Sequence, residues 1–143
     1  MKLKGFTLFL YYKHNKAIAE VLKEDGKSFF LLSTASNLEE RDNSKLEVFT
    51  SALREIKKSG YRGTVNVILT GKYFERWVTG KTFPPAHLVE NTMSAIKVLD
   101  SCLFVINFKQ LTRVTREIKE NTVQVENNSV LDLINELEAE NEE

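Results

Sequence analysis

The chain has 143 residues, of which 42% are hydrophobic and 28% are charged, and its 20 basic residues balance its 20 acidic residues. This length is typical of one domain that buries enough apolar surface to fold without disulfides, and the composition is that of a soluble globular protein. The only cysteine, Cys102, excludes an internal disulfide and fits a reducing compartment, where we expect a buried, unreactive thiol. The apolar stretch within residues 5–12 is too short for a secretory signal or a membrane span. We therefore expect a single domain over residues 1–143 in a cytoplasmic protein that does not enter a membrane.

The charge is unevenly distributed along the chain. Residues 131–143 contain six acids and no base, so residues 1–130 hold 20 bases against 20 − 6 = 14 acids. A basic body with an acidic tail allows weak affinity for nucleic acid, with the tail competing for the same surface. Alternatively, the acids form the solvated face of a last helix, which is the more common arrangement and the one we favour.

The first part of the chain predicts three strands. They cover residues 5–12, 16–23 and 27–35 and are separated by the turn-prone segments "KHN" and "EDG". Such short connections join antiparallel neighbours, so these strands are expected to form a meander.

The segment "NSKLEVFTSALREIKKSG" (43–60) predicts an amphipathic helix. Asn43 or Ser44 can cap its start and Gly60 can end it. Apolar residues recur at roughly helical spacing at Leu46, Val48, Phe49, Leu53 and Ile56. Glu47 lies at the edge of this stripe, where a solvated glutamate is the usual outcome.

The second part of the chain alternates strands and helices. A strand is expected at 64–70, a short helix at 71–80, a longer helix at 83–100 and a fifth strand at 101–109. The longer helix has proline near its start and carries on one side Leu88, Met93, Ile96 and Leu99.

The C-terminal part is less informative. Residues 110–128 are polar and have no clear pattern, whereas residues 129–140 predict a final acidic helix capped by Asn128 or Ser129.

This order of elements predicts an α/β fold. Its mixed five-stranded sheet has three antiparallel strands followed by two parallel ones, with helices on both faces. The order and several phrases resemble the ribonuclease H-like superfamily over nearly the whole chain. "NSKLEVFTSAL" resembles the family's first helix, "VILTGKYF" its fourth strand and next helix, "HLVENTMSAIKVLDSCLFVINF" its later helix and fifth strand, and "NNSVLDLI" its last helix.

The resemblance implies hydrolysis of RNA in RNA/DNA hybrids by two divalent metals, which four acidic residues hold. Glu47 and Asp132 match two of these acids. The first aspartate position holds Tyr11 or Tyr12, and the alignment places Thr70 at the second. Phenol and alcohol groups are neutral at pH 7 and are poor ligands for hard cations.

Two functional hypotheses follow from this comparison. The favoured one is a degenerate, non-catalytic binding module that needs no cofactor, in which Glu47 and Asp132 are remnants that bind metal weakly at best. The alternative is a nuclease with an altered Mg²⁺ or Mn²⁺ site, in which the same two acids are aided by Asp42 or Glu126.

Candidate nucleic-acid-binding residues come from two segments. Asn43 and Ser44 match the family's Asn-rich helix entry, which contacts the minor groove. In "GKYFERWVTGK", aromatic residues alternate with basic ones at Lys72, Tyr73, Arg76 and Trp77, so they can stack on bases and meet phosphates. The alternative, which we favour slightly, is that the two aromatic residues form one packed helix face. The partner is expected to be a nucleic acid or a protein, and the sequence does not indicate an oligomeric state.

Overall fold

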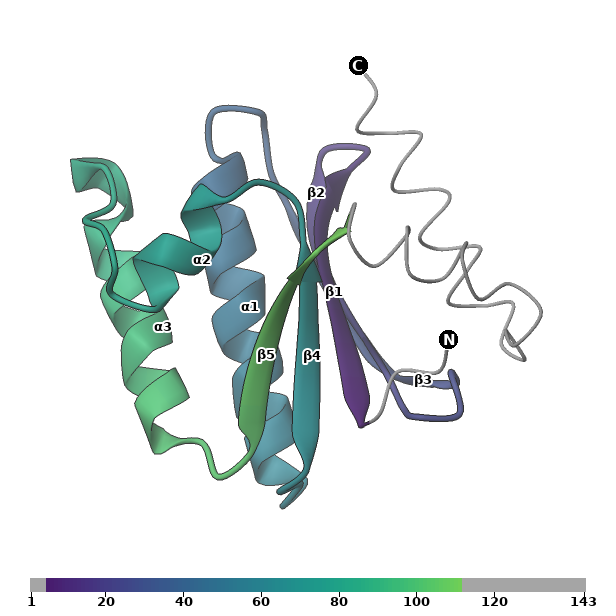
Figure 1. Ribbon diagram of the computed structural model, residues 1–143. Coiled ribbons are helices and arrows are strands. Elements are labelled where there is room, and N and C mark those ends of the chain that lie inside the picture. Colours follow the sequence, from purple (N-terminus) through teal and green to yellow (C-terminus); the bar gives the residue numbers. More distant parts are fainter. Residues whose placement is uncertain (1–4, 112–143) are drawn as a thin grey trace.

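A computed structural model describes residues 5–111, which form one sheet and a layer of helices (Figure 1). The five strands are β1 (Phe6–Lys13), β2 (Lys16–Leu22), β3 (Ser28–Ala35), β4 (Thr64–Leu69) and β5 (Val105–Gln110). Their order in the sheet is β3-β2-β1-β4-β5, with β1, β2 and β3 antiparallel and β4 and β5 parallel to β1. The predicted mixed topology is therefore confirmed.

The hairpin between β1 and β2 explains why the first strands pair in this register. His14 and Asn15 both have positive φ, 51° and 58°, as a two-residue hairpin turn requires. Asn tolerates this conformation because its short side chain can bond locally, and here its Oδ1 accepts a hydrogen bond from the Tyr12 hydroxyl at 3.2 Å. The turn places Lys13 opposite Lys16 and fixes every later pair of the two strands.

The helices are α1 (Arg41–Lys58), α2 (Tyr73–Val78), the 3₁₀ turn η1 (Ala86–Leu88) and α3 (Val89–Ser101). All of them lie on the same face of the sheet (Figure 1). The sequence predicts helices on both faces, and the helix expected at 129–140 lies outside the described residues, as does Asp132. Among residues 5–111, no helix is long and apolar enough to cross a bilayer.

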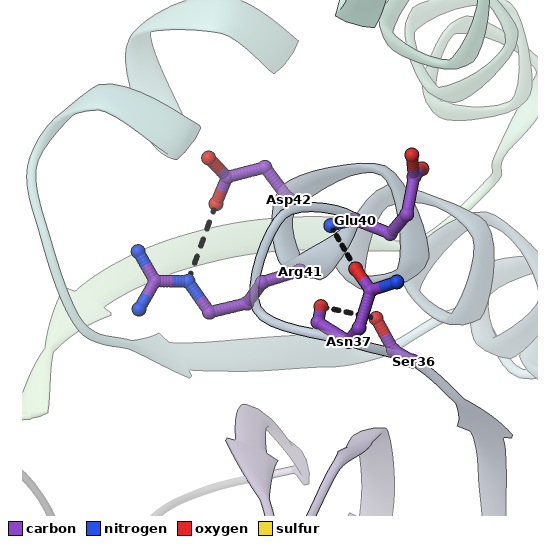
Figure 2. A network of polar contacts seen from close by, with 5 residues as sticks. All are labelled: Ser36, Asn37, Glu40, Arg41 and Asp42. Atoms are coloured by element: carbon purple, nitrogen blue, oxygen red, sulfur yellow. Dashed lines mark hydrogen bonds and ion pairs between the residues drawn. The ribbon is translucent and has the colours of Figure 1, made fainter.

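The start of α1 differs from the prediction that Asn43 or Ser44 caps it. The helix begins two residues earlier, at Arg41, after Glu40. The Glu40 N–H donates to Asn37 Oδ1 at 2.9 Å (Figure 2), so this side-chain bond to a backbone N–H three residues later directs the chain into the helix. At the other end, Gly60 has the positive φ expected of a terminator, 79°.

The core lies between the sheet and the helices. The predicted apolar stripe of α1 is confirmed, because all five of its residues are buried. They pack on alternate residues of the strands, among them Leu8 and Leu10 of β1 and Val65 and Val67 of β4.

The predicted apolar side of α3 is partly wrong. Met93 is 57% exposed, and the buried positions of α3 are Thr92, Ala95 and Val98. Small side chains face inward because α3 packs closely against α1. Two boundaries also differ from the prediction. The helical region expected from residue 83 begins only after Pro84 and Pro85, at Ala86, and the strand expected from residue 101 begins at Val105.

Candidate nucleic-acid interface

The two positions at which the sequence resemblance places aspartates lie on β1 and directly after the neighbouring strand β4. β1 and β4 are parallel neighbours, with Phe9 opposite Ile68. Tyr11 and Thr70 each lie two residues beyond this last pair along the chain. The carboxyl ends of adjacent strands thus carry a phenol and an alcohol where the ribonuclease H pattern has two carboxylates.

Tyr11 is buried and hydrogen-bonded within the fold. Its side chain is 9% exposed and points to the face opposite Leu8 and Leu10, because side chains alternate along a strand. Its hydroxyl donates to Glu20 Oε2 at 3.4 Å. Burial, together with the charge and hydrogen bond of Glu20, raises the pKa of Tyr11 to about 12, so the phenol stays neutral at physiological pH.

The other tyrosine at this strand end, Tyr12, has a structural role. Its hydroxyl lies 3.3 Å from the Ser36 carbonyl oxygen as well as near Asn15, so it ties the β1–β2 turn to the end of β3. Both tyrosine hydroxyls are therefore used within the fold.

Glu47 lies on α1 and is exposed. Within residues 5–111 it makes no hydrogen bond or ion pair. Asp42, the helper considered in the nuclease hypothesis, lies 3.9 Å from Arg41 Nε (Figure 2). Among the described residues there is no group of three or more His, Cys, Asp or Glu side chains that could hold a metal. The donors in residues 5–111 therefore do not fit a pair of hard cations, which need several carboxylates.

The two residues predicted to bind nucleic acid at the start of α1, Asn43 and Ser44, lie against other parts of the fold. Asn43 donates to the His87 carbonyl oxygen at 3.3 Å and accepts from Asn91 Nδ2 at 2.9 Å. Ser44 is only 7% exposed. Asn43 therefore connects α1 to η1 and α3, and its role in nucleic-acid binding stays a prediction.

Lys45 is a feature that the sequence analysis missed. Only 7% of this lysine is exposed, and its Nζ lies 6.0 Å from the centre of the Phe74 ring of α2. Burial lowers the pKa of Lys45 to about 8, while Asp42 partly opposes this effect. The signal was present, because Lys45 precedes Phe49, Ala52 and Ile56 at helical spacing and so belongs to the apolar stripe.

α2 presents aromatic and basic side chains on its outer surface. Phe74 and Val78 are its buried residues, whereas Tyr73 is 57% exposed and Trp77 is half-buried. The interpretation of Tyr73 and Trp77 as one packed face is therefore wrong for Tyr73. The two rings are nearly parallel, at 21°, with centres 6.5 Å apart.

Three basic residues lie on or next to α2, and one of them is placed against the Tyr73 ring. Lys72 Nζ lies 5.7 Å from the centre of the Tyr73 ring, and Arg76 is exposed one helical turn later. After the helix, the N–H of Lys81 donates to the Arg76 carbonyl oxygen at 2.8 Å, which folds Lys81 back onto the end of α2. Residues 71–82 contain one acid, Glu75, against these three bases. We call Lys72, Tyr73, Arg76, Trp77 and Lys81 the α2 surface.

Comparisons with known proteins place the chain by its fold. Neither a protein-family model nor a curated protein matches it. Among solved structures, ribonuclease H1 from Halobacterium salinarum is similar with a TM-score of 0.57 at 13% identity, over 79% of this chain and 88% of the other. LC11-RNase H1 in complex with an RNA/DNA hybrid gives a TM-score of 0.60 at 13% identity, over 73% and 83%. The N-terminal ribonuclease H domain of a Mycobacterium tuberculosis protein gives 0.56 at 12% identity, over 74% and 82%. Likeness at this level of identity concerns architecture alone, and the strand order found above agrees with it. The chain has a ribonuclease H-like fold.

Proposed function

We propose that this chain is a ribonuclease H-like module that binds nucleic acid through the α2 surface and does not hydrolyse it. The observation that carries the proposal is the exposed Tyr73 ring beside the half-buried Trp77 ring, on a segment that also carries Lys72, Arg76 and Lys81. Cations neutralise phosphates, and exposed aromatic rings offer area for stacking to bases.

The strand ends support the non-catalytic part of the proposal. A two-metal reaction needs anionic oxygens that bridge the cations. Tyr11 is buried and neutral, Thr70 is an alcohol, and the matching acid Glu47 is exposed without a partner among residues 5–111. The second matching acid, Asp132, would have to supply the rest of the site.

A nucleic-acid partner also agrees with the fold. One of the similar structures, LC11-RNase H1, was solved with an RNA/DNA hybrid. The surface charge favours nucleic acid over a protein partner, since an excess of two positive charges in residues 71–82 complements a polyanion. A protein partner bound through a sheet edge or helical face remains the other outcome of the binding test.

The binding test measures the anisotropy of a labelled RNA/DNA hybrid over a range of salt concentrations. The variant Lys72→Gln/Arg76→Gln should bind more weakly, and its slope of log K against log[salt] should fall by up to about 1.8, or roughly 0.9 for each lost phosphate contact. The control Lys23→Gln/Lys27→Gln removes the same charge at the exposed β2–β3 turn and should leave the slope unchanged. Equal effects of both variants, or no binding at low salt, would contradict the proposal.

A separate experiment distinguishes the nuclease alternative. An intact metal site stabilises the folded state by RT ln(1 + [L]/Kd), or about 2.7 kcal/mol at a metal concentration of 100 Kd. We expect millimolar Mg²⁺ or Mn²⁺ to raise the Tm of the wild type no more than that of Glu47→Gln/Asp132→Asn. A metal-dependent rise that only the wild type shows would favour a nuclease with an altered site.

A further inference from the structure

We infer that the α2 surface recognises unpaired bases, so that single-stranded nucleic acid is its preferred ligand over a base-paired duplex. This inference rests on the proposed function and names the class of nucleic acid. It starts from the exposure of Tyr73, since 57% of this residue is accessible although the next residue, Phe74, is 5% exposed.

The fold holds the two rings in place. Phe74 packs edge-on against Phe49 of α1, with ring centres 5.3 Å apart, and Val78 is 2% exposed. These two contacts fix the rotation of α2 on the core, so Tyr73 and Trp77 are presented from a rigid base. A preorganised ring loses little conformational freedom when a planar ligand stacks on it.

The arrangement of rings and charges suits a nucleotide strand. An unpaired base can extend the near-parallel stack of Tyr73 and Trp77, whose rings are 21° apart. Lys72 Nζ lies over the Tyr73 ring, 5.7 Å from its centre, so a base that stacks on this face displaces the flexible lysine side chain toward the neighbouring phosphate. Arg76 and Lys81 continue the positive charge along the helix end.

A duplex cannot use the same features. Its bases are stacked on one another and expose only their edges, so a helix surface can meet the phosphates but cannot insert a ring between the bases without unstacking them. A duplex would therefore gain from the cations of the α2 surface and not from its rings.

The chain supplies its own probe, because Trp77 is its only tryptophan. Intrinsic fluorescence is titrated with a single-stranded oligothymidine and, in parallel, with an RNA/DNA hybrid of the same length, in the full chain. We expect the single strand to quench Trp77 and to bind more tightly than the hybrid at equal salt. Tyr73→Leu should weaken single-strand binding by about 5- to 150-fold, the factor for one lost base stack, and Tyr73→Phe should retain it.

The outcomes separate the two proposals. Tight single-strand binding without a change of Trp77 emission, or equal binding by Tyr73→Leu and Tyr73→Phe, overturns the inference and leaves nucleic-acid binding in place. Preference for the hybrid also overturns it. If neither ligand binds, the proposed function itself fails. Because Tyr73 is exposed, its substitution leaves the core intact, which a thermal melt of both variants verifies.

Discussion

Replacement of Lys45 by methionine should stabilise the protein by an amount that depends on pH. Lys45 is 7% exposed, and within residues 5–111 no hydrogen bond or ion pair of its Nζ compensates for the lost hydration. Methionine retains a long apolar side chain beside Phe74 and removes the charge, so the packing is largely kept.

The size of the effect follows from the pKa of Lys45. Burial lowers this pKa from an ordinary 10.5 to about 8. Each pKa unit corresponds to about 1.4 kcal/mol, so holding the ammonium form in the folded state costs about 3 kcal/mol as an upper estimate. Below the folded pKa, both the folded and the unfolded lysine are charged and this cost is fully present. As the pH rises from the folded to the unfolded value, the unfolded chain binds more protons, and the wild type therefore gains stability.

Urea unfolding at several pH values measures how the free energies of unfolding of the wild type and of Lys45→Met depend on pH. The free energy of unfolding of the variant should exceed that of the wild type by up to about 3 kcal/mol near neutral pH, and the difference should shrink as the pH approaches about 10. Lys97→Met, which removes an exposed lysine of α3, should change stability by less than about 0.5 kcal/mol at any pH. A difference that does not vary with pH, or that matches the Lys97 control, would refute the reasoning.

Three further substitutions test the packing and the strand end. Tyr11→Phe removes the hydroxyl that lowers the pKa of Glu20, so an NMR titration should find the Glu20 pKa higher than in the wild type. The lost hydrogen bond should also lower the free energy of unfolding by about 0.5–1.5 kcal/mol. An unchanged Glu20 pKa would show that the hydrogen bond is not formed in solution. Phe49→Ala should lower the unfolding free energy by about 3–5 kcal/mol, because this ring is fully buried and contacts Phe74, and a loss below about 1 kcal/mol would mean that the core is not packed around it. Gly5→Ala should be at least about 1 kcal/mol more destabilising than Gly60→Ala, since both glycines have positive φ but only at Gly5 would the new methyl group meet the Thr64 carbonyl oxygen; denaturant unfolding of the pair gives the comparison, and equal losses would contradict it.

Much of the fold could be predicted from local patterns in the sequence. The order of strands and helices followed from alternation, turn residues and the apolar stripe of α1, all of which depend on near neighbours in the chain. The topology followed from general rules for connecting strands. The predicted starts of α1, α3 and β5 were wrong. At α1 the overlooked signal is local, because Asn37 accepts a hydrogen bond from the Glu40 N–H three residues later.

The candidate site was less predictable because exposure is a tertiary property. Tyr73 and Trp77 are four residues apart, so their spacing indicated a shared helix face but not whether that face is buried. The position of Phe74 and Val78 against the core decided that Tyr73 is exposed. In the same way, Asn43 matched a ligand-binding pattern, and only the structure shows that its amide is bound to His87 and Asn91.

The most direct test of the account is to follow an RNA/DNA hybrid that is demonstrably bound. The hybrid, labelled on its RNA strand, is incubated with the full chain and Mn²⁺ at a protein concentration that saturates the anisotropy signal, and the RNA is then resolved by length. The account predicts a bound and intact RNA strand, with binding that weakens in Lys72→Gln/Arg76→Gln. Cleavage by the wild type that disappears in Glu47→Gln/Asp132→Asn would contradict it and would establish a working nuclease.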